Sequence, residues 1–482
     1  MFWRGVLGYL PVNIAQGVVG LLTLVVFTRL LTPAEFGHYA LGFAVMSLLH
    51  TAVFTWNEAA LARFQVAELD KGSGADHAAT VQRTWLVLLL GALPLAALAL
   101  LVWPLSGPLK LAVLAGLGAI LPRTMAKLAQ ERRRAIGDVR GAAAIDLVQI
   151  LGGFAIGAVC AMAGLGGASP LIGFGVAAAL SVVWAVPQEI ATASGGRFQP
   201  ARARRYAGYG IPVAASLILT LVLTSTDRFM LAAFLDEAAV GLYHAGYSLA
   251  SRTIDVLFIW LGTAGGPALV AALERGGREG LAAEAREQAS LMLLLTAPAT
   301  VGLVLVAAPL CELMVGQDLR DGAAHVTPWI AASALLSGLT TYYFHQAYTL
   351  GRRTGLLIAV MAAPALANLA LNLVLIPACG LDGALWATLT SYAIGLVASI
   401  LLGRKVLPMP IPWAPLAQAA FASAAMAAVV VCIPPLGGIV ELFLKVAVGA
   451  LVYCGLVLAM DAGGLRSRAL PLLRRFTPGA AA

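Results

Sequence analysis

The feature of this sequence that most constrains its fold is a succession of apolar segments, each long enough to cross a lipid bilayer. A helix needs about 20 apolar residues to span the hydrocarbon core, and only a helix satisfies its backbone hydrogen bonds within one such segment. We therefore predict an all-α membrane protein with about fourteen transmembrane helices. The predicted spans are 8–30, 39–62, 84–104, 111–126, 142–163, 171–190, 209–232, 243–270, 287–309, 325–350, 354–376, 381–402, 415–433 and 439–461.

The composition supports this fold class. Hydrophobic residues make up 60% of the chain and charged residues 11%, whereas a soluble domain carries about 25% charged residues. Most of the surface must therefore face lipid. The net charge of +8 comes from basic residues in short clusters between the apolar segments, which is the pattern of membrane loops and does not indicate nucleic-acid binding.

The basic residues also predict the orientation. Of the 31 lysines and arginines, 24 fall in the segments on one side of the predicted membrane, and only Lys110 and Arg320 fall in the loops on the other side. Lysine and arginine concentrate in cytoplasmic loops. We therefore predict that both chain termini lie in the cytoplasm.

An internal repeat predicts the domain organisation. The segment TPAEFGHYALGF at 32–43 matches DEAAVGLYHAGY at 236–247 at Ala, Gly, Tyr and Gly positions with a constant offset. Six predicted spans separate the copies, so both have the same orientation, as in transporters built from parallel repeats. We predict an N-terminal lobe at 1–207, a C-terminal lobe at 208–405, each with six parallel-repeated helices, and two further helices with a cytoplasmic tail at 406–482.

The same residues carry a family resemblance. The segment TRLLTPAEFGHYAL at 28–41 resembles the opening signature of Wzx-type polysaccharide-unit flippases, and DRFMLAAFLDEAAVGLYHAGYSLASR at 227–252 resembles the start of their second lobe. These flippases belong to the multidrug, oligosaccharidyl-lipid and polysaccharide exporter superfamily. The resemblance implies alternating access around a central cavity, and a polyprenyl-diphosphate-linked oligosaccharide moved from the inner to the outer leaflet. It also implies a bacterial inner membrane, and a polysaccharide polymerase and chain-length proteins as partners.

The motifs that are missing narrow the function. The sequence contains no P-loop, no G-x-S-x-G motif and no H-E-x-x-H motif, and its five cysteines form no C-x-x-C pair. We therefore expect a transporter that is not an enzyme and uses no cofactor or metal. The alternatives are an ion-coupled multidrug antiporter, a lipid II flippase and, from another class, a membrane glycan polymerase or ligase.

Charged residues inside spans are costly and are therefore candidates for function. Arg252 lies deepest, near the middle of its span, and Asp255 follows one helical turn later on the same face. In one interpretation Arg252 faces a water-filled cavity and attracts a diphosphate or an acidic sugar. In the other, Arg252 and Asp255 neutralise each other as a structural pair. The repeat places Leu48 and Thr51 at the equivalent positions of the first lobe, which favours function.

The remaining candidates lie nearer the ends of spans or are uncharged. Arg29 and Arg228 either line the mouth of the cavity or extend to the outer lipid headgroups. Asn368 and Asn372, one turn apart, either bind the glycan or bond a neighbouring helix. Arg123 is expected to extend to the inner headgroups.

Three further residues are candidates for ion coupling. They are Asp227, Glu58 and His50. Glu58 is either a protonatable coupling group or a carboxylate at the membrane surface near Arg63. His50 is either a proton relay or a buried histidine bonded to a neighbouring helix.

Overall fold

The computed structural model describes residues 2–102 and 105–467. Within these residues the chain is helical and has no β-strand, which confirms the predicted fold class. The end of the predicted cytoplasmic tail, with Arg468, Arg474 and Arg475, lies outside the described residues. The chain divides into two compact units, unit 1 (Met1–His244) and unit 2 (Ala245–Ala482), and each is described by itself.

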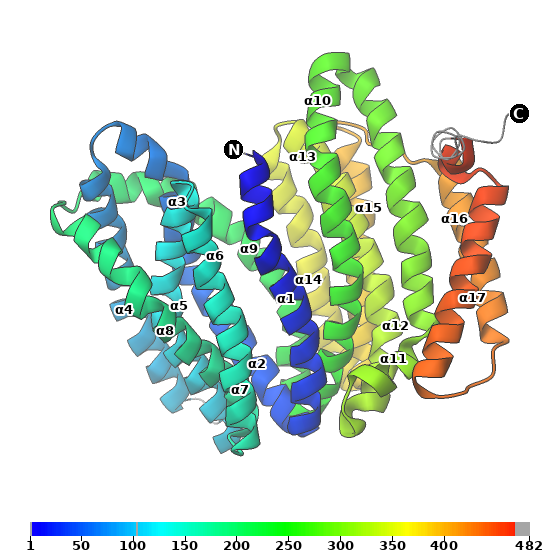
Figure 1. The fold of residues 1–482 in the computed structure, drawn as a ribbon, viewed down its shortest axis with the longest axis horizontal. Coiled ribbons are helices and arrows are strands. Elements are labelled where there is room, and N and C mark those ends of the chain that lie inside the picture. The colour runs from blue at the N-terminus through cyan, green and yellow to red at the C-terminus, as the bar shows by residue number, and fades with distance from the viewer. Residues whose placement is uncertain (1, 103–104, 468–482) are drawn as a thin grey trace, which may run out of the picture. The chain divides into compact units, whose positions relative to one another are not determined.

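Unit 1 holds the first spans of the chain. Its elements are α1 (Phe2–Leu30), α2 (Pro33–Val53), α3 (Thr55–Asp70), α4 (Gly74–Val102), α5 (Gly107–Ala135), α6 (Val139–Leu147), η1 (Val148–Gly152), α7 (Gly153–Met162), η2 (Gly166–Ala168), α8 (Ser169–Ser194) and α9 (Pro200–Phe234). The helices α6, η1 and α7 follow one another directly and together cover the predicted span 142–163. In this unit α8 packs along both α5 and α7, and α2 packs along α5 (Figure 1).

Unit 2 begins inside a long helix. This helix, α10 (Glu237–Leu305), starts in unit 1 and is followed by α11 (Ala307–Met314), α12 (Gln317–Leu339), η3 (Thr340–Phe344), α13 (Gln346–Leu350), α14 (Thr354–Cys379), α15 (Leu381–Gly403), α16 (Trp413–Val431), α17 (Gly438–Ala459) and η4 (Ala462–Gly464). Gly277 interrupts α10 with a non-helical backbone, φ 60° and ψ −148°. Figure 1 shows the two arms of α10 folded back on each other at this point.

The spans agree with the predicted number. In the part of the chain that the structure describes, twelve helices are long and apolar enough to cross a membrane. Among these α10 is counted once, although its two arms correspond to the predicted spans 243–270 and 287–309. The predicted span 325–350 is formed by α12, η3 and α13, which lie outside the twelve. Counting the second arm of α10 and the span formed by α12, η3 and α13 raises the number of membrane crossings from twelve to about fourteen.

The predicted span 39–62 is not one helix. The helix α2 ends at Val53, Phe54 interrupts it, and α3 begins at Thr55. Thr51, Val53 and Thr55 are β-branched, and such side chains lose conformational freedom in a helix. The interruption therefore falls in a segment of low helix propensity, although neither proline nor glycine marks it.

Both copies of the sequence repeat begin a helix with a side-chain cap. Before α2, the hydroxyl of Thr32 accepts a hydrogen bond from the Glu35 N–H at 3.3 Å, and the Glu35 carboxylate accepts one from the Thr32 N–H at 2.9 Å. Before α10, the Asp236 carboxylate accepts a hydrogen bond from the Ala239 N–H at 2.7 Å. These caps bind backbone donors that the first helical turn leaves without partners. They explain why each repeat starts with a threonine or an aspartate.

The second glycine of each repeat packs within its own unit. A Cβ atom placed on Gly42 would lie 3.0 Å from the carbonyl oxygen of Ala112 in α5. A Cβ atom on Gly246, the matching residue, would lie 2.8 Å from the carbonyl oxygen of Ala323 in α12. Both glycines therefore permit a close helix–helix contact that an alanine would push apart. The two copies of the repeat share this architectural role.

The boundary between the two compact units falls after His244, inside α10, so that α9 belongs to unit 1. The division into lobes at 1–207 and 208–405 stays a prediction. A charged cluster holds the predicted inner end of α9 to α3. Arg202 places its Nη2 atom 3.1 Å from the Glu68 carboxylate, and Arg205 donates a hydrogen bond to the same carboxylate. Ser73 donates another through its hydroxyl at 2.7 Å.

This cluster also sets the charge of Glu68, whose side chain is 3% exposed. Burial acts to raise the pKa of the Glu68 carboxyl, but the hydrogen bonds from Ser73 and Arg205 and the charges of Arg202 and Arg205 outweigh it. The pKa of Glu68 is therefore held below its usual value, and the carboxylate is ionised at neutral pH.

Candidate functional site

The polar side chains that lie within spans form separate groups in the two units. In unit 1, Asp227 near the end of α9 is fully buried, and the hydroxyl of Tyr243 donates a hydrogen bond to its carboxylate at 2.6 Å. The neighbouring Arg228 is also buried, with 8% of its surface exposed. An arginine that extends to lipid headgroups would be exposed. The structure therefore favours an internal role for Arg228 over the headgroup interpretation.

A second group lies where α2 meets α3. His50 places its Nε2 atom 3.1 Å and 3.2 Å from the two carboxylate oxygens of Glu58. The two residues are eight positions apart, which in a straight helix means about 12 Å along the axis. Both side chains are buried, and Phe54 lies between them at the junction of α2 and α3. The predicted neighbour of Glu58, Arg63, is instead exposed and lies over the ring of Phe64.

Arg123 of α5 lies near the same pair of residues. The sequence analysis did not predict this position. Its guanidinium lies 4.9 Å from the centre of the Phe174 ring, one of its nitrogens lies 4.0 Å from the sulfur of Met46, and it interacts electrostatically with Glu58. The expectation that Arg123 extends to the headgroups is therefore wrong. The sequence did contain a signal for an internal position, because a cation is stabilised beside a buried carboxylate such as Glu58. The position of Arg123 near the end of a span instead suggested contact with the headgroups.

Arg29 differs from these buried groups. It is exposed at the end of α1, and its guanidinium donates a hydrogen bond to the carbonyl oxygen of Val25 at 2.7 Å. This bond lies within its own helix. The geometry of Arg29 fits either of the two roles predicted for it.

In unit 2, Arg252 and Asp255 lie on the same helix but differ in exposure. Arg252 is exposed and Asp255 is half-buried on the first arm of α10. Among the described residues, no ion pair or hydrogen bond joins the Arg252 guanidinium to Asp255 or to any other side chain. The geometry therefore does not match a pair of charges that neutralise each other.

Asn368 and Asn372 occupy the interior of unit 2. Both are fully buried in α14, and the amide nitrogen of Asn372 donates a hydrogen bond to the amide oxygen of Asn368 at 3.0 Å. Buried amides that bond each other stabilise helix packing. Their burial favours a structural role over glycan binding.

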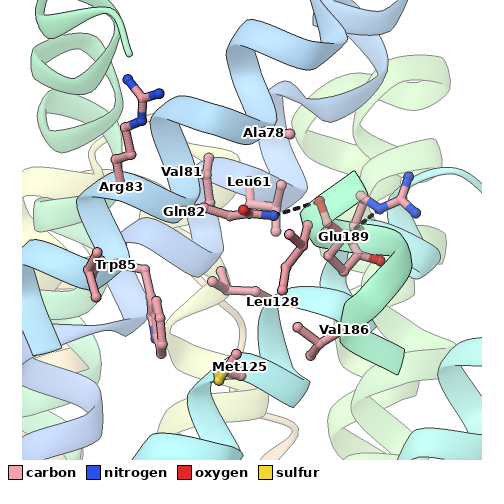
Figure 2. Close-up of a pocket in the computed structure, with 13 residues that line it drawn as sticks. Leu61, Ala78, Val81, Gln82, Arg83, Trp85, Met125, Leu128, Val186 and Glu189 are labelled. Atoms are coloured by element: carbon pink, nitrogen blue, oxygen red, sulfur yellow. Dashed lines mark hydrogen bonds and ion pairs between the residues drawn. The ribbon is translucent and has the colours of Figure 1, made fainter. Parts of the chain in front are cut away.

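A cavity of about 250 Å³ lies inside unit 1 among α3, α4, α5 and α8 (Figure 2). Its wall is mostly apolar, with Leu61, Val81, Met125, Leu128 and Val186. At its edge Arg132 and Glu189 form an ion pair, and Gln82 donates a hydrogen bond to the backbone oxygen of Glu189 at 2.7 Å. Arg132 and Glu189 are thus already paired with each other, and the cavity is smaller than the roughly 300–1,000 Å³ of typical ligand pockets. We do not place the transport substrate there.

Comparison with known proteins was made against families, curated proteins and solved structures. A family model described as "Polysaccharide biosynthesis protein" matches residues 26–322, more than half of the chain. No curated protein matches. The lipid II flippase MurJ in its inward closed conformation aligns with a TM-score of 0.76 and 14% identity, covering 93% of this chain and 98% of that chain.

Two further solved structures have the same fold. An inward-facing multidrug resistance MATE family transporter of the MOP superfamily aligns with a TM-score of 0.62 and 13% identity, covering 82% of this chain and 93% of that chain. A MOP superfamily transporter from Pyrococcus furiosus Vc1 aligns with a TM-score of 0.51 and 13% identity, covering 83% and 92%. At these identities the likeness concerns the fold alone. Together with the family match it confirms the predicted resemblance: the chain belongs to the polysaccharide biosynthesis protein family and has the fold of MOP superfamily flippases and transporters.

Proposed function

We propose that this protein is a flippase that moves a polyprenyl-diphosphate-linked oligosaccharide from the inner to the outer leaflet of a bacterial inner membrane. It acts by alternating access, in the synthesis of a surface polysaccharide, and with both termini in the cytoplasm. A polysaccharide polymerase and chain-length proteins would then receive the product. The family and the fold support a membrane transporter. The exposure of Arg252, which lies within a predicted span, supports an anionic substrate.

Arg252 differs from the other cations predicted to lie within spans. Arg123 lies over an aromatic ring, Arg228 is buried, Arg29 binds a backbone carbonyl, and Lys445 forms an ion pair with Glu441 at 2.6 Å. Among the described residues Arg252 has no such partner and remains exposed. Placing a charged side chain in lipid at the centre of a bilayer costs roughly 3 kcal/mol of free energy on insertion scales. We infer that Arg252 faces water and is available to a ligand.

The depth of Arg252 fits this inference. It lies fifteen residues after the start of α10, which corresponds to about 22 Å of helix. A bilayer with its headgroups is about 40–45 Å thick, so Arg252 lies near the middle. Extension to the headgroups serves arginines near helix ends and does not serve a residue at this depth.

The guanidinium also suits the proposed substrate. Arginine presents planar hydrogen-bond donors that match phosphate oxygens in pairs. A diphosphate and its sugars would face a heavy desolvation cost in crossing hydrocarbon. A polar path that contains Arg252 would lower this cost while the polyprenyl tail stays in lipid.

The experiment compares Arg252→Ala, Arg252→Lys and Arg278→Ala in a strain that lacks the wild-type gene. Arg278 is an exposed arginine of the same helix near Gly277 and serves as the matched control. The assay extracts polyprenyl-linked units and measures how fast a periplasmic glycan-modifying enzyme reaches them. We expect Arg252→Ala to lower this rate about tenfold or more, since a hydrogen bond to a charged group contributes about 1.5–3 kcal/mol, while Arg252→Lys retains part of it.

The same assay tests the function itself. The deletion strain should accumulate units that the periplasmic enzyme does not reach, and should lose its surface polysaccharide. Normal access in the deletion strain, with no second flippase present, would refute the proposal. Rescue of a strain that lacks its lipid II flippase would instead support the lipid II alternative.

A further inference from the structure

Two cavities adjoin the first half of α4 in unit 1, and they share Arg83 and Leu86. The first, which we call the α8 cavity, is the space of about 250 Å³ among α3, α4, α5 and α8 described above. The second, which we call the α9 cavity, measures about 490 Å³ and is lined by α4, by Phe198 before α9 and by Ala203 within α9. Both walls are mostly apolar. Arg83 is therefore a cation placed between two apolar cavities.

Arg83 differs from the other charged side chains of the α8 cavity. Arg132 and Glu189 form an ion pair, and Gln82 binds the backbone oxygen of Glu189. In the part of the chain that the structure describes, no hydrogen bond, ion pair or ring contact engages the exposed guanidinium of Arg83. Figure 2 shows this guanidinium at the end of the cavity opposite Met125, pointing away from the apolar wall. It is therefore available to a ligand whose apolar part occupies the cavities.

The position of Arg83 in the chain places it at the level of the inner lipid headgroups. It directly precedes the predicted span 84–104, on the predicted inner side, whereas Trp85 and Val186 of the α8 cavity lie within predicted spans. Phe198 of the α9 cavity lies outside the predicted spans, and 39% of its surface is exposed. Contact with a lipid chain would remove this ring from water. The arrangement matches an amphiphile with its head at Arg83 and its apolar part in the cavities.

We propose that unit 1 binds one anionic phospholipid of the inner leaflet, with its phosphate on Arg83 and one acyl chain in each cavity. Basic sites between transmembrane helices on the cytoplasmic side suit lipid headgroups, and arginine matches phosphate oxygens in pairs. Two cavities beside one cation fit a lipid with two chains and one phosphate. A polyprenyl carrier has a single chain and would leave one cavity empty. This lipid site is separate from the proposed transport function and does not depend on it.

The charges around Arg83 favour a headgroup with a net negative charge. A zwitterionic phospholipid also carries an ammonium group, which a carboxylate would stabilise. The carboxylate of the α8 cavity, Glu189, is already paired with Arg132, and the residues that line the α9 cavity include no acidic one. Arg204, which is exposed and directly follows Ala203, adds positive charge to the start of α9. The site therefore complements a phosphate better than a phosphate with an attached ammonium group.

The first test measures whether the site selects lipid charge. The full chain is reconstituted in phosphatidylcholine vesicles with a trace of phosphatidylglycerol or phosphatidylcholine that carries the same photoactivatable acyl chain, and peptide mass spectrometry maps the cross-links on α4 and 198–203. We expect about ten times more cross-linking from phosphatidylglycerol and a ratio near one in Arg83→Ala, which loses the hydrogen bonds to the phosphate. Arg140→Ala is the matched control, because Arg140 is also exposed on the predicted inner side and lines neither cavity. A ratio near one in wild type, or an unchanged ratio in Arg83→Ala, would overturn the proposal.

The second test addresses the two chains and keeps Arg83 in place. Ala203→Phe fills the α9 cavity with a larger side chain. It should lower cross-linking of two-chain phosphatidylglycerol and spare the one-chain lyso form, whose chain still fits the α8 cavity. An equal loss for both forms would contradict the two-chain arrangement. Displacement of the phosphatidylglycerol probe by an equal concentration of polyprenyl phosphate would also overturn the proposal, because it would make the site an entrance for the carrier.

A third measurement uses no cross-linking and is independent of transport. A ligand that binds only the folded protein stabilises it by mass action. Phosphatidylglycerol added to the purified protein in detergent should therefore raise the unfolding temperature of wild type and of Arg140→Ala. It should raise that of Arg83→Ala much less, and an equal rise in Arg83→Ala would count against a lipid site at this arginine.

Discussion

Replacing Glu68 by glutamine tests how firmly the inner end of α9 is held to α3. In the native protein the Glu68 carboxylate binds Arg202, Arg205 and the hydroxyl of Ser73, and its side chain is 3% exposed. Glutamine keeps the size of the side chain and removes its charge. The two arginines then lose their common counter-ion while they remain in place.

The magnitude follows from the exposure of each partner. Breaking a buried ion pair costs about 3–5 kcal/mol. Arg205 is 48% exposed and regains water, and Arg202 keeps a hydrogen bond to the backbone oxygen of Ser73 at 3.3 Å. We therefore expect Glu68→Gln to lower the free energy of unfolding by about 2–3 kcal/mol.

The assay is thermal unfolding of the purified protein in detergent, with Glu131→Gln as the matched control. Glu131 also has two cationic neighbours, with its carboxylate 2.8 Å from Lys127 and 2.9 Å from Arg134, but both of these are about one-third exposed. Such exposed pairs contribute about 0–1 kcal/mol. A loss of stability in Glu68→Gln no larger than in Glu131→Gln would refute the reasoning.

The pH dependence offers an independent check. Because the pKa of Glu68 is lowered in the folded protein, its contribution to stability is complete above the ordinary glutamate pKa of about 4.3 and is lost as the pH falls through the lower folded-state value. The stability difference between wild type and Glu68→Gln should therefore stay constant from pH 8 to about pH 5 and shrink only below about pH 4. A difference that already shrinks near neutral pH would contradict the lowered pKa.

Two further predictions follow from the topology and from the buried pair of unit 1. Reporter fusions after residues 75, 136, 200, 277 and 405 should report the cytoplasm, and fusions near 35, 167, 238 and 380 the outside; two reversed sites would overturn the fourteen-span topology. On the hypothesis that Glu58 couples transport to an ion, Glu58→Gln removes the charged partner of His50 and should lower the transport rate about tenfold while the protein stays in the membrane. Full activity in inverted vesicles would remove Glu58 from the coupling candidates.

The sequence predicted the spans because their signal is local. A run of about 20 apolar residues leaves little choice but a transmembrane helix. The repeat likewise identified Gly37 and Gly241 as equivalent residues, because identical spacing is visible in one dimension. These two glycines pack against each other in the folded chain, and this contact was not predictable, since it depends on how two helices cross.

The pairing of His50 with Glu58 was not predictable for a different reason. His50 lies in α2 and Glu58 in α3, on either side of Phe54, and helical spacing predicts contacts between residues three or four positions apart, not eight. Arg123 was misplaced because depth along a span says nothing about which face a side chain occupies. The contact of Glu68 with Arg202 and Arg205, which joins α3 to α9, was not predictable because these residues lie far apart in the sequence.

The repeat offers a way to separate architecture from function in this chain. Groups present in both copies make matching packing contacts, as Gly42 and Gly246 do against α5 and α12. Two polar residues, Arg252 and His50, occur in only one copy of the repeat. Arg252 corresponds to Leu48 in the first copy, and His50 corresponds to Ile254 in the second. These two residues also differ from each other, since His50 is buried beside the carboxylate of Glu58 whereas Arg252 is exposed.

We propose that this difference reflects distinct physical tasks of the His50–Glu58 pair and of Arg252. The buried His50–Glu58 pair lies inside a predicted span, which makes it a candidate for ion coupling. An exposed mid-membrane guanidinium can exchange water for the oxygens of an anion, which suits substrate binding. Loss of anion binding with intact proton coupling in Arg252→Ala, and the reverse in Glu58→Gln, would be the expected signature of this division.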